Sequence, residues 1–138
     1  MFRILLAEDN PGDVLLFREA LKTRKIAFEV EVAEDGQRAL ALVRKLAGAG
    51  EHLDLIVLDV NLPRHSGDEI LQQIRREPSL AAIPVVMLTS SCSPADQEKA
   101  GALGANLYMQ KPSDLDQLLE VACVIESLLL RSQSHGIA

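Results

Sequence analysis

Five polar residues that could act together in chemistry stand at the ends of short apolar runs of the sequence. They are Glu8, Asp9, Asp59, Thr89 and Lys111. Three carboxylates packed within a few ångströms repel one another and take up protons unless a cation neutralises them. Oxygen ligands of this kind suit a hard cation, and Mg²⁺, which keeps several of its waters, fits best. A carboxylate held beside Mg²⁺ and an ammonium group can also attack phosphorus and become an aspartyl phosphate.

The segments that must position this group alternate between strands and helices. The expected strands are 3–7, 28–33, 53–58, 83–88 and 107–110, and the expected helices are 11–23, 36–46, 66–76, 94–103 and 114–130. Strict alternation predicts a doubly wound α/β fold, in which a five-stranded parallel sheet carries helices on both faces. Right-handed crossovers leave few topologies, among them the flavodoxin-like strand order 2-1-3-4-5. Ligands of such sheets bind beyond the carboxyl ends of the strands, where the five polar residues would converge.

Each of these residues has a simpler explanation when it is taken alone. An Asp after a strand is usually a turn or cap residue, Thr89 alone would bond to the local backbone, and Lys111 alone would be a solvated charge. The joint pattern is more specific, because every expected strand but the second is followed by, or ends in, a residue suited to phosphoryl chemistry. Turn formers alone would show no preference for acids after two inner strands and a lysine after a third.

Length and composition fit one ordinary globular domain. The chain has 138 residues, of which 48% are apolar and 25% are charged, enough for a single core. The formal charge of −6 argues against nucleic acid as a partner, because phosphate backbones need a basic surface. No segment is long enough to span a membrane, and the 2 cysteines form no CxxC pair. We therefore expect a cytoplasmic protein without a secretory signal.

The spacing of these motifs resembles that of the receiver-domain family of two-component response regulators, and the likeness covers about 2–130. The motifs that carry it are Glu8-Asp9, Leu-Ile-Val-Leu-Asp-Val-Asn-Leu-Pro around Asp59, Gly67 in the loop that follows, Thr89 and Lys111-Pro112. As a set they are highly specific, although no single one of them would be. The resemblance implies the flavodoxin-like (βα)5 receiver fold and a switch operated by phosphorylation.

The resemblance also implies roles for single residues at the site. Asp59 would accept a phosphoryl group from a sensor histidine kinase. Mg²⁺ would be bound by Asp9 directly, by Glu8 directly or through water, by Asp59, and by the backbone carbonyl of Asn61. The chain itself would be a phosphoacceptor rather than an enzyme, with at most slow self-dephosphorylation.

Three residues would carry the switch that follows phosphorylation. Thr89 would move to hydrogen-bond the phosphoryl oxygens, Lys111 would pair with their charge, and Tyr108 would turn inward as Thr89 moves. As in relatives, the peptide bond between Lys111 and Pro112 is expected to be cis, a feature typical of tight turns. Ser90 stands where a smaller residue is frequent, which would narrow access to the phosphoryl group.

Two stretches of the sequence indicate a particular subgroup of the family. Glu-Asp-Asn-Pro-Gly-Asp at 8–13 and Ile-Pro-Val-Val-Met-Leu-Thr-Ser-Ser at 83–91 are similar to those of small stand-alone regulators that partner bacterial and cyanobacterial phytochrome kinases. Openings of this type also occur in regulators of other kinases. The expected organisation is a receiver domain over 1–131 and a short tail over 132–138, with no output domain.

The last expected helix has more apolar residues than one buried face requires. One stripe, which would dock on the sheet, comprises Leu115, Leu118, Leu119, Ala122, Ile125 and Leu129. Val121, Val124 and Leu128 fall on a different side, and exposed apolar stripes usually mark a partner surface. We expect a homodimer through the fourth helix, the fifth strand and the fifth helix, unless a neighbouring helix covers this second stripe.

The first and fourth expected helices also bear on signalling. In the first, the expected core face comprises Leu16, Phe17, Ala20 and Leu21. Leu15 then points outward, which resembles the place where receivers dock on the helices of their kinase, although single exposed leucines are common. The fourth helix is rich in alanine and contains Gly101, so it would bury little and be mobile, as a population-shift switch requires.

Three other classes of protein share part of this pattern. A phosphatase of the haloacid-dehalogenase type also uses an Asp nucleophile with Mg²⁺, but it needs a second Asp where Asn61 stands and a cap for which the chain has no room. A flavin electron carrier needs a first loop that binds phosphate, which Glu8 and Asp9 would repel. A receiver-like binding module that acts without phosphorylation stays the alternative, although such chains usually lack an acid or the lysine.

Overall fold

A computed structural model of the chain describes residues 2–49, 52–60, 62, 66–78, 80–90 and 93–137. The strands in this described part are β1 (Phe2–Ala7), β2 (Phe28–Ala33), β3 (Leu55–Asp59), β4 (Val85–Thr89) and β5 (Leu107–Gln110). The helices are α1 (Pro11–Thr23), α2 (Gly36–Ala49), α3 (Gly67–Arg76), α4 (Pro94–Leu103) and α5 (Leu115–Ile137). The predicted alternation of strands and helices is confirmed.

The strands form a five-stranded parallel sheet in the order β2-β1-β3-β4-β5, which confirms the predicted topology. Its register pairs Ala7 with Leu58, Asp59 with Leu88, and Thr89 with Gln110. Every residue of β3 and β4 is buried, as expected for inner strands covered on both faces. This register aligns the carboxyl ends of β1, β3, β4 and β5 along one edge of the sheet.

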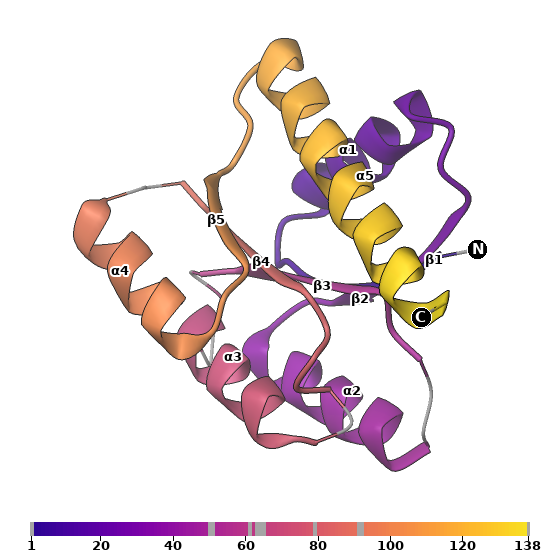
Figure 1. Ribbon diagram of the computed structural model, residues 1–138. Coiled ribbons are helices and arrows are strands. Elements are labelled where there is room, and N and C mark those ends of the chain that lie inside the picture. Colours follow the sequence, from indigo (N-terminus) through magenta and orange to yellow (C-terminus); the bar gives the residue numbers. More distant parts are fainter. Residues whose placement is uncertain are drawn as a thin grey trace.

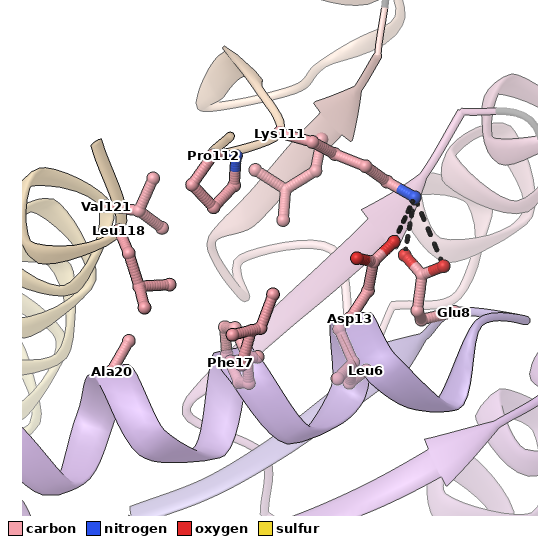
Figure 2. A pocket seen from close by; sticks show the side chains of 11 residues that line it. Leu6, Glu8, Asp13, Phe17, Ala20, Lys111, Pro112, Leu118 and Val121 are labelled. Carbon is pink, nitrogen blue, oxygen red and sulfur yellow. Dashed lines mark hydrogen bonds and ion pairs between the residues drawn. The ribbon is translucent and has the colours of Figure 1, made fainter. Parts of the chain in front are cut away.

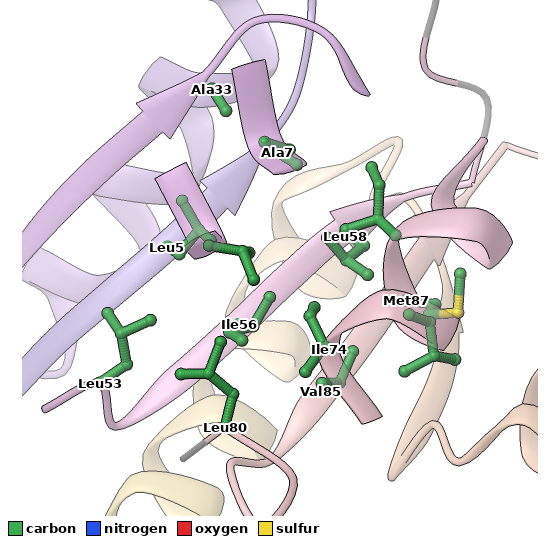
Figure 3. Packing of buried hydrophobic residues seen from close by; sticks show 14 of the residues in the cluster. Leu5, Ala7, Ala33, Leu53, Ile56, Leu58, Ile74, Leu80, Val85 and Met87 are labelled. Carbon is green, nitrogen blue, oxygen red and sulfur yellow. The ribbon is translucent and has the colours of Figure 1, made fainter. Parts of the chain in front are cut away.

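Helices α1 and α5 cover one face of the sheet, and α2, α3 and α4 cover the other (Figure 1). Side chains of β1 alternate between the two cores. Leu5 and Ala7 belong to the core on the side of α2, α3 and α4, whereas Ile4 and Leu6 belong to the core beside α1 and α5. Figure 3 shows the first of these cores, where Ile74 of α3 packs with the sheet. Packing on both faces makes the sheet a firm support for the residues at its edge.

Capping side chains fix where the helices beside this edge begin. Asn10 Oδ1 accepts hydrogen bonds from the backbone N–H groups of Gly12 and Asp13, at 2.8 and 3.3 Å. Pro11 takes the first helical position, where its missing N–H is not needed. Ser66 caps α3 in a similar way. The first turn of α1 is therefore held close to the end of β1.

The largest difference from the predicted boundaries is in the last helix. α5 continues to Ile137, whereas the sequence predicts an end at Leu130 and a tail over 132–138. The segment 131–135 holds no glycine or proline that would stop a helix, so the helix continues through it. Other boundaries differ by three residues or fewer. Among the described residues no helix, α5 included, is long and apolar enough to cross a membrane.

Candidate functional site

The carboxyl ends of the strands bring together residues that are far apart in the sequence. Glu8 directly follows β1. The last residue of β1, Ala7, pairs with Leu58 of β3, so Asp59, which follows Leu58, ends its strand beside Glu8. Thr89 ends β4, and its carbonyl oxygen accepts a 2.7 Å hydrogen bond from the backbone N–H of Lys111. This bond holds the chain after β5 against β4 and places the lysine beside the acids.

Glu8, Asp9 and Asp59 form a compact acidic group. Each contributes one carboxylate oxygen to a set in which all oxygens lie within 4.8 Å of one another. Glu8 and Asp59 are buried, each with 4% of its surface exposed, whereas Asp9 faces solvent. Two buried carboxylates and one open carboxylate offer hard oxygen ligands with access from water. This combination suits a divalent cation that keeps several of its waters.

Lys111 provides a positive charge within the acidic group. Its Nζ lies 2.9 Å from Asp59 Oδ2, 2.9 Å from Glu8 Oε2 and 3.1 Å from Glu8 Oε1. Figure 2 shows the ammonium facing the carboxylates of Glu8 and Asp13. The charge of the lysine offsets the repulsion between the two buried acids.

Asp13 is a further acid of the site, and the sequence analysis missed it. It lies in the first turn of α1, and its Oδ2 is 3.2 Å from Lys111 Nζ. Its side chain keeps 38% of its surface exposed. A signal was present in the sequence, because the cap at Asn10 starts a helix there. Side chains in the first turn of a helix tilt back toward the preceding strand end, where Glu8 lies.

The surroundings change the acidity of two groups of the site. Burial is the main cause that raises the pKa of Glu8 to about 7, and the charge of Asp59 adds to it against the lowering effect of the hydrogen bond from Lys111. Burial alone would lower the pKa of Lys111, but hydrogen bonds to Asp59 and Glu8 raise it well above its ordinary value. Lys111 therefore stays charged, while Glu8 exchanges a proton near neutral pH in the metal-free protein.

The two switch residues expected beside Lys111 lie on β4 and β5. Thr89 is buried, with 2% of its surface exposed. Tyr108 packs against the core on the side of α2, α3 and α4, and its hydroxyl oxygen is buried. Tyr108 is half-buried, and its hydroxyl is turned away from solvent. A movement coupled to Thr89 stays a prediction.

Gly67 stands where the start of α3 passes close to the end of β3. Its N–H donates a 3.1 Å hydrogen bond to the carbonyl oxygen of Val60. A Cβ at this position would lie 2.7 Å from the backbone oxygen of Asp59 and 3.0 Å from the Cα of Val60. Any side chain here would push α3 away from Asp59, so the approach requires glycine.

Another aspartate of the same segment takes no part in the acidic group. Asp54 lies directly before β3, at the end opposite to Asp59. Its carboxylate accepts a 2.8 Å hydrogen bond from the N–H of Arg3, and its second oxygen lies 2.8 Å from His52 Nε2. These contacts join the starts of β1 and β3, which is a structural role.

Two expectations concern the loops around the site. The predicted cis bond between Lys111 and Pro112 is wrong, since the described residues contain no cis peptide bond. For an X–Pro bond the trans form is favoured by about 0.5–1 kcal/mol, and the structure adopts this form. Asn61, the predicted source of a metal-binding carbonyl, lies outside the described residues.

The prediction for the outer surface of α5 is partly wrong. Val121, expected on a dimer surface, is only 4% exposed and belongs to the core beside α1. Val124 and Leu128 are half-buried and remain candidates for that surface. Leu115 and Leu119, expected to dock on the sheet, are 66% and 38% exposed. The buried face of α5 consists instead of Val121, Ala122, Ile125 and Leu129.

The outer surface of α1 borders an apolar groove near the site. Leu15 is 59% exposed, as expected, but Leu16 is also 44% exposed rather than part of the core. Leu16 lines the groove between α1 and the start of α5, together with Pro112 and Leu118. The adjoining pocket in Figure 2 reaches the carboxylates and the ammonium of the site.

Comparisons with known proteins agree with this geometry. The family model of the response regulator receiver domain matches residues 4–122. Response regulator Rcp1 of Synechocystis sp. is 37% identical over 134 residues, which cover 94% of this chain and 89% of Rcp1. The crystal structure of the Mn²⁺-bound form of Rcp1 matches with a TM-score of 0.80 at 36% identity, covering 92% of this chain and 93% of that chain.

A second solved structure is that of RcpA, a phosphorylated cyanobacterial phytochrome response regulator. It matches with a TM-score of 0.83 at 37% identity, and 94% of each chain is covered. The segment matched by the family model includes the whole acidic group, Asp13, Thr89 and Lys111. Sequence, fold and site geometry agree, and the chain belongs to the response regulator receiver domain family.

Proposed function

We propose that this chain works as a phosphorylation switch in which Asp59 accepts a phosphoryl group from a sensor histidine kinase in a Mg²⁺-dependent reaction. The proposal rests on the surroundings of the Asp59 carboxylate. It is a buried carboxylate at the end of β3, 2.9 Å from the ammonium of Lys111 and within 4.8 Å of two further acids. A carboxylate held in this way is suited to act as a nucleophile toward phosphorus.

The proposed transfer exchanges one bond to phosphorus for another. An oxygen of Asp59 attacks the phosphorus of the phosphohistidine and forms the new O–P bond. The P–N bond breaks, and its electron pair stays on the imidazole nitrogen of the kinase. Lys111 stabilises the negative charge on the phosphoryl oxygens throughout. When bound, Mg²⁺ supplies further charge neutralisation and aligns the phosphoryl group.

Glu8, Asp9 and Asp59 are the residues that would hold the cation. Their oxygens form the donor set that a hard divalent ion prefers, and the acids of the site outnumber the single lysine beside them. The Mn²⁺-bound form of Rcp1 shows that a similar protein binds a divalent ion, which supports a divalent ion in this chain. Mg²⁺ is the proposed ion because its preference for oxygen ligands and retained waters fits two buried acids and an open one.

We propose a phytochrome-type histidine kinase as the partner, on the support of the similarity to RcpA. The kinase histidine must come within bonding distance of Asp59, so the kinase is expected to dock beside the strand ends. The groove lined by Leu16, Pro112 and Leu118 opens there and offers apolar surface to a partner helix. Leu15 lies on the same helix and is open to solvent.

Further parts of the proposal concern assembly, turnover and place of action. A homodimer would form through α4, β5 and α5, with Val124 and Leu128 on its surface. The chain itself would act as a phosphoacceptor with at most slow self-dephosphorylation. The charge of −6 makes nucleic acid an unsuitable partner, and we expect action in the cytoplasm. The alternative is a receiver-like binding module in which Asp59 is never modified.

Mass spectrometry after incubation with acetyl phosphate and Mg²⁺ tests the phosphoacceptor. The wild type is expected to gain one phosphoryl group, and the gain should disappear with EDTA and in Asp59→Asn. Asp54→Asn is the matched control, because Asp54 lies at the opposite end of the same strand and should leave the gain intact. A folded wild type without any gain would favour the binding module, and a gain that persists in Asp59→Asn would place the acceptor elsewhere.

A further inference from the structure

We propose that Asp13 is a positioning residue for Lys111. When a divalent cation takes the oxygens of Glu8 and Asp59, the ammonium keeps Asp13 as its carboxylate partner, and this makes cation binding more favourable. The inference rests on the metal site of the proposed function. It concerns an acid supplied by a helix rather than by a strand end, and the family resemblance gives this acid no role.

Lys111 and a divalent cation compete for the same oxygens. Nζ lies 2.9 Å from Glu8 Oε2 and 2.9 Å from Asp59 Oδ2, and both carboxylates belong to the group that would bind the cation. Two positive centres a few ångströms apart repel each other strongly where little water separates them. The lysine must therefore weaken its contacts with Glu8 and Asp59 when the cation binds.

The ammonium of Lys111 needs another partner when those contacts weaken. It has three N–H donors, and only 21% of the side chain is exposed, so water cannot fully replace the lost hydrogen bonds. Asp13 offers its Oδ2 at 3.2 Å, from the side of α1 (Figure 2). Asp13 does not belong to the set of acids whose oxygens lie within 4.8 Å of one another, so a lysine paired with it does not occupy a metal ligand.

The start of α1 holds Asp13 independently of the other acids. Its backbone N–H donates a 3.3 Å hydrogen bond to Asn10 Oδ1, and Pro11 fixes the first turn of the helix. The dipole of α1 favours a negative charge at this end of the helix. Asp13 can therefore keep its place while Lys111 shifts its hydrogen bonds from one carboxylate to another.

Loss of the charge on Asp13 could weaken cation binding by two routes. In the proposed route, Lys111 remains on Glu8 and Asp59 and opposes the cation. In the other route, Asp13 attracts the cation from a distance by its charge alone, and the lysine plays no part. A double-mutant cycle with Lys111 separates the two routes, because only the first one requires the lysine.

The experiment is a titration of the unphosphorylated full chain with Mg²⁺ by isothermal titration calorimetry. Asp13→Asn is expected to weaken binding about three- to tenfold, which is modest because the carboxylate is partly exposed. Asp13→Glu should restore wild-type binding, since it keeps the charge. Glu19→Gln is the matched control. It removes an exposed acid of the same helix whose ion pair, in the described part of the chain, is with Lys22, and it should leave Mg²⁺ binding unchanged.

The cycle is completed in a background without the lysine. Lys111→Met is expected to tighten Mg²⁺ binding, and adding Asp13→Asn to it should change binding by less than about twofold. Circular dichroism shows whether each variant is folded, and Lys111→Gln replaces Lys111→Met if the latter does not fold. Unchanged Mg²⁺ binding in Asp13→Asn would overturn the inference, and so would an equal loss in the background without the lysine.

Failure of the proposed function gives a different result. If the wild type itself does not bind Mg²⁺ at millimolar concentration, the proposed metal site is wrong and the inference fails with it. If the wild type binds Mg²⁺ and is phosphorylated on Asp59, but Asp13→Asn binds Mg²⁺ as the wild type does, only the role of Asp13 is wrong.

Discussion

Lys111 Nζ and Asp59 Oδ2 lie 2.9 Å apart although 52 positions of sequence separate the two residues. The contact spans the sheet, because β3 and β5 are not neighbours and β4 lies between them. The backbone of Lys111 is fixed to β4 by its 2.7 Å hydrogen bond to the carbonyl oxygen of Thr89. The position of the ammonium is thus determined twice, by the backbone at β4 and by the carboxylates at the ends of β1 and β3.

The stability of the metal-free protein is expected to depend on the protonation of Glu8. The folded-state pKa of about 7 lies above the ordinary value of 4.5, so protonation favours the folded state. This contribution is fully present below about pH 4.5 and is lost as the pH rises through about 7. Urea denaturation in EDTA should show a decrease in the free energy of unfolding on the order of 2 kcal/mol across this range.

Glu8→Gln is the control for this pH dependence, because the amide does not titrate. The variant should lose most of the decrease between pH 4.5 and 7 while remaining folded. Saturating Mg²⁺ should also abolish the decrease in the wild type, since a bound cation keeps the carboxylate ionised. A variant that retains the full pH dependence would show that another group is responsible.

Gly67→Ala is expected to destabilise the protein and to slow its phosphorylation. The new Cβ would meet the backbone oxygen of Asp59 at 2.7 Å, and the strain should cost about 1–3 kcal/mol of unfolding free energy. Displacement of Asp59 should also lower the rate of phosphorylation by acetyl phosphate. Gly101→Ala in α4 is the matched control, because its Cβ meets nothing within 4 Å and should stabilise the helix by about 1 kcal/mol. Equal stability of the two variants would contradict the prediction.

Arg75→Met is expected to loosen the junction between α3, α4 and β5. The guanidinium donates hydrogen bonds to the carbonyl oxygen of Gly104 at 2.7 and 3.0 Å, to that of Ile83 at 2.9 Å and to Asn106 Oδ1 at 3.0 Å. Burial lowers the pKa of Arg75, so the site stabilises the charge by hydrogen bonds rather than by water. Losing these bonds should reduce the unfolding free energy by about 2–4 kcal/mol.

Thermal denaturation followed by circular dichroism measures this effect. The neighbouring Arg76 is exposed, so Arg76→Met is the control and should change the melting temperature little. The same melting temperature for both variants would mean that the hydrogen bonds of Arg75 contribute nothing net to stability.

Leu15→Ser is expected to slow phosphoryl transfer from the kinase without affecting the reaction of Asp59 with acetyl phosphate. Acetyl phosphate needs no docking surface, so its reaction with Asp59 should be unaffected by a solvent-exposed position on α1. Transfer from a purified, autophosphorylated phytochrome-type kinase should slow by about fivefold or more, as for a side chain that contributes about 1 kcal/mol to an interface. Leu130→Ser replaces a similarly exposed leucine of α5 and should leave both rates unchanged. An undiminished transfer rate in Leu15→Ser would exclude Leu15 from the kinase contact.

The parts of the site that follow strands could be predicted from the sequence. Glu8, Asp59 and Lys111 directly follow or end apolar runs, and the alternation of strands and helices predicts a parallel sheet whose carboxyl ends share one edge. For these three residues, a place at the end of a strand in the sequence predicts a place at the shared edge of the sheet. The rule does not extend to Asp13, which reaches the lysine from a helix, so the strand pattern does not predict this acid as part of the site.

The faces of the helices were predicted less well, for a related reason. Helical spacing identifies which residues share a face, but not how the helix is rotated against its neighbours. In α5 the buried face passes through Val121 because α1 packs there, and this contact leaves Leu115 exposed. In α1, the rotation of the helix turns Phe17, Ala20 and Leu21 toward the core and leaves Leu16 exposed.

The central place of β3 determines which parts of the molecule can respond to a change at Asp59. β3 has hydrogen-bonded strands on both sides and only buried residues, whereas β5 is an edge strand with a single neighbour. Amide protons of β3 should therefore exchange with solvent only on global unfolding, and those of β5 and the adjoining α4 through smaller local openings. The charge is added on an inner strand that is buried on both faces, so we expect the resulting deformation at the less constrained margin formed by α4 and β5.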